Sequence, residues 1–261
     1  MLMAGSDRKT GFLSLSGSIN EHMPEWQIAS IRLPGSGPED MKALAQKILG
    51  LYADKEGILF PFDDKAVLLT RYGSLGDSVA FKSELEQKLA GRGYTFMVRQ
   101  MSAEALKQVE ENFVDGDGSA DTLFKDRLKR PENRILVVDD DFFYRALMQK
   151  ECEGYAKMHQ SEDGKNAVEL YREINPDIVF LDIHLPSAPG LAILEQLSNV
   201  DFDAFIIMMS SDTSKHNVLQ AVKKGASGVL KKPPESGKLL RIFRACPTFK
   251  KSPLQQEAAK A

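Results

Sequence analysis

Short apolar runs alternate with helical patterns in the second half of the chain. Four runs of nearly continuous apolar residues lie at 134–138, 177–181, 204–209 and 227–230. Such runs are typical of strands that are buried on both faces of a parallel sheet, and the segments between them have the length and spacing of amphipathic helices. The pattern therefore predicts an α/β domain with a five-fold β-α alternation over residues 133–246.

The first half of the chain has its elements in a different order. Strand and helix patterns succeed one another as β-α-β-β-α-β, and the polar turn Asp63-Asp64-Lys65 joins the two central strands. This order predicts a ferredoxin-like α+β domain over residues 26–112. The expected strands are 26–33, 57–62, 66–71 and 94–101. One expected helix begins at Pro38, and two others cover 77–90 and 103–112.

Three segments lack a clear pattern of apolar positions. Residues 1–25 are rich in glycine, serine and polar side chains, which predicts a flexible lead-in. Residues 113–132 combine glycine and aspartate with a run of charged side chains and a proline, which predicts a linker. Residues 247–261 are expected to form a short tail.

Length and composition narrow the classes of function. A chain of 261 residues suits two domains. Its 34 basic and 37 acidic residues give a net charge of −3, so we expect neither nucleic-acid nor membrane-surface binding. No apolar stretch reaches the length of a membrane span, and no signal peptide is evident, so a cytoplasmic location is expected. The two cysteines, Cys152 and Cys246, lie at apolar helix positions and are expected to be buried thiols.

Polar side chains are concentrated where the strands of the second half end. The first strand is followed by Asp139 and Asp140, and the third by Asp182. The fourth ends at Ser210 and the fifth runs into Lys232. In parallel α/β sheets, ligands bind beyond the carboxyl ends of the strands, at the point where the strand order reverses. We therefore expect these side chains to form one site.

The chemistry of this set points to phosphoryl transfer. Clustered carboxylates repel one another unless a cation joins them, and Mg²⁺ prefers carboxylate and phosphate oxygens. A carboxylate can also attack phosphorus and form an acyl phosphate. Phosphoryl transfer needs charge neutralisation more than acid-base catalysis, and a metal ion with one lysine can provide it.

Four segments resemble the receiver domain of two-component response regulators, in the order and at the spacing of that family. They are RILVVDDDFFYRALM, IVFLDIHLP, IIMMSSD and GASGVLKKP, at 134–148, 178–186, 206–212 and 225–233. The resemblance implies a flavodoxin-like, doubly wound, five-stranded parallel sheet of order 2-1-3-4-5. It also implies a signalling protein rather than an enzyme, with a sensor histidine kinase or phosphotransfer protein as the phosphodonor.

The resemblance assigns a role to each residue of the site. Asp182 would be the phosphoacceptor, with Ser210 and Lys232 contacting the phosphoryl group. Mg²⁺ would be held at Asp139, Asp140 and Asp182 and by the backbone carbonyl of His184. The downstream protein target is not identified, and a homodimer is left open. Val229 departs from the family pattern, because many receivers carry an aromatic side chain there that turns inward as the hydroxyl moves.

Two alternatives to a phosphorylation switch remain. The hairpin at 61–69 bears a weak similarity to diguanylate cyclase domains, which carry a Gly-Gly-Asp/Glu-Glu-Phe motif there. Pro61 and Phe62 replace the two glycines, and Lys65 replaces the closing aromatic residue. A receiver-regulated, divergent nucleotide cyclase is therefore one alternative, and an adaptor that is never phosphorylated is the other. We expect the N-terminal domain to be an interaction module or a degenerate cyclase-like domain.

Overall fold

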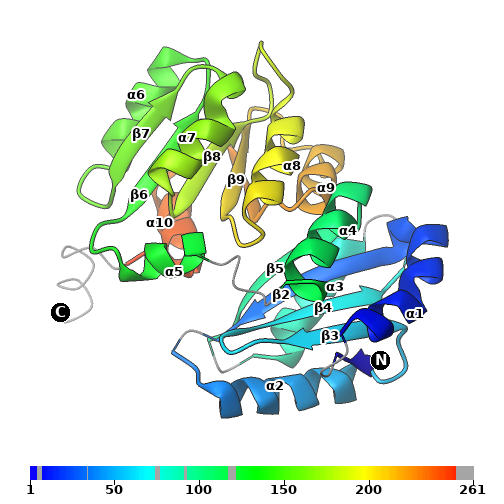
Figure 1. The fold of residues 1–261 in the computed structure, drawn as a ribbon. Coiled ribbons are helices and arrows are strands. Elements are labelled where there is room, and N and C mark those ends of the chain that lie inside the picture. The colour runs from blue at the N-terminus through cyan, green and yellow to red at the C-terminus, as the bar shows by residue number, and fades with distance from the viewer. Residues whose placement is uncertain (5–7, 34, 74–76, 91–92, 117–121, 251–261) are drawn as a thin grey trace. The chain divides into compact units, whose positions relative to one another are not determined.

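The chain divides into two compact units, residues 1–120 and 121–261. The computed structural model describes residues 1–250 except 5–7, 34, 74–76, 91–92 and 117–121, and both units are drawn in Figure 1. Each unit has its own sheet.

The second unit is a doubly wound parallel sheet, as predicted. Its strand order is β7-β6-β8-β9-β10, with every neighbouring pair parallel, which is the order 2-1-3-4-5. The strands are β6 (Arg134–Val138), β7 (Lys157–Ser161), β8 (Ile178–Asp182), β9 (Ile206–Ser210) and β10 (Gly228–Lys231). The helices that follow them are α6 (Phe142–Glu151), α7 (Ala167–Ile174), α8 (Gly190–Val200), α9 (Lys215–Lys223) and α10 (Ser236–Ala245).

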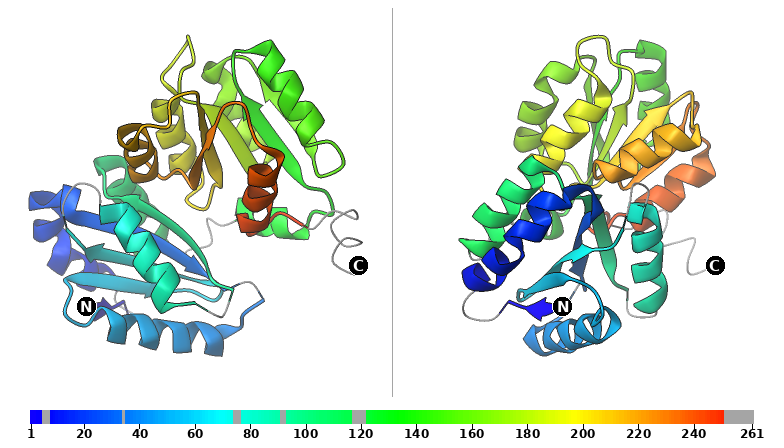
Figure 2. Two further views of the ribbon diagram at one scale, coloured as in Figure 1. Left: turned by 180° about the vertical axis from the view of Figure 1, so that it is seen from behind. Right: turned by 90° about the vertical axis from the view of Figure 1, so that its right-hand side faces the viewer.

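Helices cover both faces of this sheet because its central strands are apolar on both sides. Along β6, Leu136 and Val138 pack toward α7 and α8, whereas Ile135 and Val137 pack toward α6 and α10. Both views in Figure 2 show the sheet between these helix layers. The edge strand β7 has the polar sequence KMHQS, which is the reason that it does not stand out among the apolar runs.

The predicted linker at 113–132 is wrong over much of its length. Its first residues end a π-helical turn, Glu110–Val114, which follows helix α4 (Ala103–Val109). Helix α5 (Thr122–Lys129) then belongs to the second unit, where Phe124 and Arg127 are buried. The guanidinium of Arg127 lies 2.7 Å from Asp201 and donates to the hydroxyl of Tyr171 at 3.0 Å. The charged side chains of this segment predict an exposed linker, but one of them, Arg127, is buried. Residues 117–121 lie outside the described part.

The first unit has the ferredoxin-like arrangement that the element order predicts. Its four main strands are antiparallel neighbours in the order β3-β4-β2-β5, and the short β1 (Leu2–Met3) adds a parallel edge next to β3. The elements are β2 (Trp26–Arg32), α2 (Pro38–Leu51), β3 (Gly57–Pro61), β4 (Lys65–Arg71), α3 (Asp77–Lys88) and β5 (Thr95–Gln100).

The prediction of a flexible lead-in at 1–25 is also wrong. Residues Arg8–Glu21 form helix α1, in which Phe12, Leu15 and Ile19 are buried. These three side chains follow the spacing of one helix face, but the glycines and serines between them hide the pattern. Helix α1 packs near β3, where Gly11 approaches Ile58. Residues 5–7 lie outside the description, as does the part of the predicted tail from 251 onward.

Two further predictions concern single residues and the membrane. Both Cys152 and Cys246 are buried free thiols, as expected. Among the described residues, none of the helices combines the length and the apolar character that a membrane span requires.

Candidate functional site

The carboxyl ends of the strands in the second unit bring the expected side chains together. Asp139 follows β6 directly, Asp182 is the last residue of β8, and Ser210 is the last residue of β9. Lys232 follows β10, and its backbone N–H donates to the carbonyl of Ser210 at 2.9 Å. The tips of β9 and β10 are thereby joined. The peptide bond from Lys232 to Pro233 is cis.

Three carboxylates form the acidic part of the site. One oxygen from each of Asp139, Asp140 and Asp182 lies within 4.8 Å of the others. Asp139 is completely buried and Asp182 is 5% exposed, whereas Asp140 is exposed. The cluster therefore has an inner side within the sheet and an outer side that is open to solvent.

Lys232 bridges the two buried carboxylates. Its Nζ lies 2.6 Å from Oδ2 of Asp139 and 2.8 Å from Oδ2 of Asp182. Burial acts to lower the pKa of Lys232, but its bonds to these two carboxylates outweigh burial and raise that pKa above its ordinary value. Burial raises the pKa of Asp139, while Lys232 and the backbone N–H of Asp141 oppose the rise. The lysine is therefore held as an ammonium ion against the phosphoacceptor candidate.

Backbone N–H groups fix the orientation of the carboxylates. The N–H of Asp141 donates to Oδ1 of Asp139 at 3.0 Å, and the N–H of His184 donates to Oδ1 of Asp182 at 3.2 Å. Asp141 itself caps helix α6, since its Oδ1 accepts the N–H groups of Phe143 and Tyr144 at 2.8 and 3.2 Å. The helix therefore begins directly after the acid pair.

Arg145 supports the turn that carries the acid pair. Its side chain is buried, and its guanidinium donates to the backbone carbonyl of Asp139 at 2.7 Å. It also lies 3.6 Å from the exposed carboxylate of Glu162. The bond to the carbonyl of Asp139 links the end of β6 to the first turn of α6.

Ser210 is buried at the end of the strand next to Asp182, but its hydroxyl is engaged within its own loop. It donates to the carbonyl of Asp212 at 2.7 Å and accepts the N–H of Asp212 at 3.0 Å. The structure therefore places Ser210 beside the acidic cluster by strand pairing, with its hydroxyl bonded to the β9–α9 loop.

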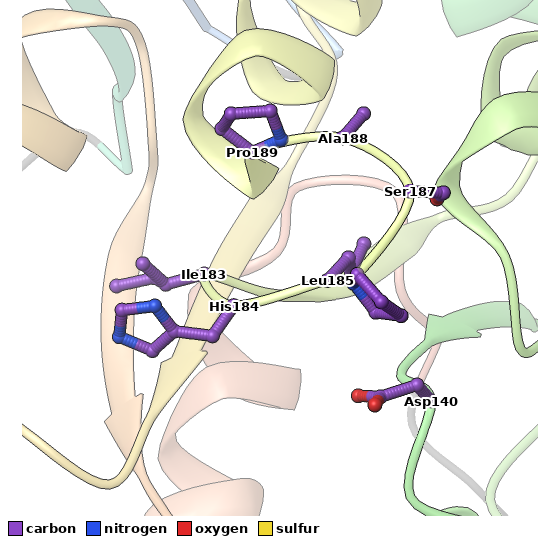
Figure 3. A pocket seen from close by; sticks show the side chains of 8 residues that line it. Asp140, Ile183, His184, Leu185, Ser187, Ala188 and Pro189 are labelled. Atoms are coloured by element: carbon purple, nitrogen blue, oxygen red, sulfur yellow. The ribbon is translucent and has the colours of Figure 1, made fainter.

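A cavity of about 560 Å³ opens beside the carboxylates. It is lined by Asp140 and by the loop 183–189, which runs from β8 to α8 and faces Asp140 in Figure 3. Gly190 closes this loop, and its N–H donates to the carbonyl of Ile183 at 3.0 Å. A Cβ at Gly190 would lie 1.9 Å from the carbonyl oxygen of Asp182, so a larger residue would displace the backbone of the site.

One neighbour of the site was not found by reasoning on the sequence. The ring of Tyr144 lies against the ammonium of Lys232, with 4.5 Å between Nζ and the ring centroid. Tyr144 is 7% exposed and belongs to the core between the sheet and helices α6 and α10. Its position in the FFYR segment is typical of an ordinary core residue. The sequence therefore carries no signal that distinguishes a residue packed in the core from one that also contacts Lys232.

The residues present fit a divalent cation such as Mg²⁺. With all carboxylates ionised, three carboxylates and one ammonium leave a formal charge of −2 (−3 plus +1) at the cluster. Its ligand atoms are hard oxygens, and the exposed side at Asp140 leaves room for water or phosphate oxygens.

Sequence comparison with known proteins supports the receiver class for the second unit. Residues 135–244 match the response regulator receiver domain. Chemotaxis protein CheY of Bacillus subtilis (strain 168) is 34% identical over 113 residues, which cover 42% of this chain and 94% of that protein. CheY of Listeria monocytogenes is 35% identical over 112 residues, covering 42% and 94%. The CheX-CheY-BeF3-Mg+2 complex from Borrelia burgdorferi is 30% identical, covers 43% of this chain and 87% of that chain, and has a TM-score of 0.41.

The fold and the site define a receiver domain of a two-component system. The chain belongs to the response regulator receiver family through its second unit. The similar proteins are signalling proteins rather than enzymes. The family match leaves residues 1–134 outside it, and helix α5 lies in that part.

Proposed function

We propose that this protein is a response regulator in which Asp182 accepts a phosphoryl group and so switches contacts with other proteins. The observation that carries the proposal is the ammonium of Lys232, which lies between Asp139 and Asp182 inside a cluster of three carboxylates. A lysine that served packing alone would not need two charged partners at the open end of a sheet.

The reaction is an attack by a carboxylate on phosphorus. An oxygen of Asp182 forms a bond to the phosphorus of the donor, and the bond between phosphorus and the donor's leaving atom breaks. The electron pair of that bond leaves with the donor, and Asp182 becomes an acyl phosphate. Lys232 neutralises charge on the phosphoryl oxygens, and Ser210 supplies a hydroxyl from the neighbouring strand end.

Asp139, Asp140 and Asp182 would hold Mg²⁺, together with the backbone carbonyl of His184. When bound, the ion supplies neutralisation of the charge that a phosphoryl group brings to a negative site. Of these carboxylates, Asp140 is the exposed one. The ion and the phosphodonor therefore reach the cluster from the side on which Asp140 lies. The phosphodonor in this proposal is a sensor histidine kinase or a phosphotransfer protein, and the target is a further protein.

The N-terminal unit is proposed to be an interaction module rather than a cyclase. In its β3–β4 hairpin, the carboxylate of Asp64 is paired with the guanidinium of Arg32 at 2.7 Å. The ring of Phe62 packs against Phe113, with centroids 5.6 Å apart, and the guanidinium of Arg8 lies 4.7 Å from its centroid. These groups are engaged in packing at the place where cyclase domains keep glycines for nucleotide approach.

The test is phosphorylation of the full-length protein by acetyl phosphate with Mg²⁺, followed by intact mass and peptide mapping. We expect one phosphoryl group on Asp182, and no labelling of Asp182→Asn, because an amide is a poor nucleophile. Asp126→Asn is the matched control, since Asp126 is an exposed aspartate on helix α5. Mapping of the label to another residue would reject Asp182 as the acceptor, and no labelling of the wild type would reject the proposal and favour the adaptor alternative.

A further inference from the structure

Lys232 has a third neighbour besides its two carboxylates. The ring of Tyr144 lies 4.5 Å from its Nζ, measured to the ring centroid. At this distance the electron-rich face of an aromatic ring attracts a cation, and the attraction grows as water is excluded. The side chain of Lys232 is only 14% exposed, so the contact is largely shielded from solvent.

The side chain of Tyr144 is held in place by its backbone hydrogen bond and by core packing. Its backbone N–H is bonded to Asp141, the cap of helix α6, at 3.2 Å. Its ring is part of the buried cluster that includes Met148, Leu230 and Phe243. The residue is therefore held from both ends, by the cap that follows the acid pair and by the core beneath the sheet.

Lys232, in contrast, has a flexible stem and an ammonium with three N–H donors. Two carboxylates, Asp139 and Asp182, lie within ion-pair distance of it. The ring of Tyr144 covers a further side of the ammonium. Together these neighbours restrict the places to which the charge can move.

We propose that Tyr144 is a positioning residue for Lys232, which keeps the ammonium at Asp182 ready for the incoming phosphoryl group. The inference rests on the proposed function, because it concerns how Lys232 is held for phosphoryl transfer. Tyr144 does not replace the aromatic residue that the family carries at Val229. Val229 packs with the core between the sheet and helices α7 and α8, on the opposite face from the cluster of Tyr144.

The aromatic face, rather than the hydroxyl, makes the contact. Within the described part of the chain, the buried hydroxyl of Tyr144 has no hydrogen-bond partner. A phenylalanine at this position would keep the ring over Lys232, whereas a leucine would keep apolar bulk but lose the attraction for the cation. The pair Tyr144→Phe and Tyr144→Leu therefore separates ring from packing.

The first experiment measures the rate of labelling by acetyl phosphate with Mg²⁺. We expect Tyr144→Leu to slow labelling about fivefold, the effect of a cation–π contact of ordinary strength. Tyr144→Phe should stay within about twofold of the wild type on the same reasoning. Phe243→Leu is the matched control, since it removes a ring from the same core. It should leave the rate at the wild-type value.

A double variant distinguishes positioning from packing. If Tyr144 acts through Lys232, Tyr144→Leu should slow labelling in the wild-type background but add nothing in Lys232→Ala. Equal slowing in both backgrounds would overturn the proposal, as would a wild-type rate in Tyr144→Leu. A Tyr144→Phe variant as slow as Tyr144→Leu would also overturn it, because the hydroxyl would then be the active group.

A second readout requires no labelling, and its main arm uses the wild-type protein alone. The ring of Tyr144 should shift the ε-methylene proton resonances of Lys232 upfield in the metal-free wild-type protein, and the shift should persist in Tyr144→Phe. Unshifted resonances would overturn the inference whatever the labelling rates. A wild type that shows this shift but is not labelled would reject the proposed function while leaving the Tyr144–Lys232 contact supported.

Discussion

Arg127 and Asp201 form an ion pair of 2.7 Å in which both side chains are almost completely buried. The pair joins helix α5, which precedes the family match, to the residue that caps the end of helix α8. Tyr171 donates a hydrogen bond to the same carboxylate at 2.7 Å. The receiver of this protein is therefore built from more of the chain than the family pattern covers.

We predict that Arg127→Met lowers the free energy of unfolding of the receiver by about 3–5 kcal/mol, because Asp201 is left as a buried charge without its cation. Urea unfolding followed by circular dichroism measures the effect. Fluorescence of Trp26, the single tryptophan, reports the N-terminal unit and should keep its midpoint. Lys238→Met, which breaks the exposed pair with Glu235, should cause no measurable change. An unaltered receiver midpoint in Arg127→Met would contradict the prediction.

Much of the receiver could be predicted because its central strands are buried on both faces. The apolar runs predict β6 at its observed bounds and β8 one residue too early. Helix α5 could not be predicted from its own residues. The segment Leu-Phe-Lys-Asp-Arg-Leu-Lys has the charge of an exposed linker. Arg127 can be buried only because Asp201, 74 residues away, accepts its hydrogen bond. The same holds for helix α1, whose three buried side chains are separated by glycine and serine.

The grouping of the candidate site's side chains follows from the sequence more directly than the loops around them do, for a physical reason. Asp182 ends its strand and Asp139, Asp140 and Lys232 come just after theirs. The parallel arrangement brings these strand ends together whatever the loops do. The state of Ser210 could not be predicted, because its bonds to Asp212 depend on the loop conformation. Tyr144 could not be found either, since a buried aromatic on a helix is most often core.

The two thiols should be unreactive in the folded protein at pH 8. Burial raises the pKa of Cys152 to about 12 and that of Cys246 to about 11, above the ordinary value of 9.0. Their contribution to stability is therefore fully present below about pH 9 and is lost as the pH rises through 11 and 12. Reaction with a thiol-specific disulfide reagent should be slow in buffer and fast for both cysteines in urea. Rapid reaction of the native protein would contradict their burial.

Mg²⁺ should stabilise the receiver against heat. At a concentration about 100 times its dissociation constant, an ion that binds the folded state alone adds about 2.7 kcal/mol. We expect the midpoint of thermal unfolding to rise with Mg²⁺ in the wild type and to respond much less in Asp140→Ala. Glu173→Gln removes an exposed charge on helix α7 and should behave like the wild type. If Asp140→Ala responds fully, the three-carboxylate site is not where the ion binds.

Phosphorylation should alter the loops after β9 and β10. The group adds a charge of roughly −1.5 to −2 at neutral pH, which draws Lys232 and the hydroxyl of Ser210 toward Asp182. Amide exchange in 210–217 and 226–234 should therefore change on binding of beryllofluoride. Ser210→Ala should weaken that change without preventing labelling, and Lys232→Ala should uncouple the two. Identical exchange with and without the bound mimic would show that this receiver does not switch through these loops.

The N-terminal unit should not convert GTP to a cyclic dinucleotide with Mg²⁺ or Mn²⁺, in either phosphorylation state. Pro61 and Phe62 lie where nucleotide approach needs glycines, and the carboxylate of Asp64 is paired with Arg32. Chromatography of reaction products after prolonged incubation provides the measurement, with a known cyclase as a positive control. Detectable product would promote the cyclase alternative over the interaction module.

The hydrogen bond from the N–H of Lys232 to the carbonyl of Ser210 has a mechanical consequence. The ammonium and the hydroxyl that would respond to a phosphoryl group are carried by two strand tips, and this bond ties the tips together. A state in which one tip moved alone would lose a backbone hydrogen bond in a buried place. Movement of the two tips together is therefore favoured over movement of either tip alone. If a phosphoryl group on Asp182 moves these loops, as proposed, the exchange changes in 210–217 and 226–234 should therefore appear together.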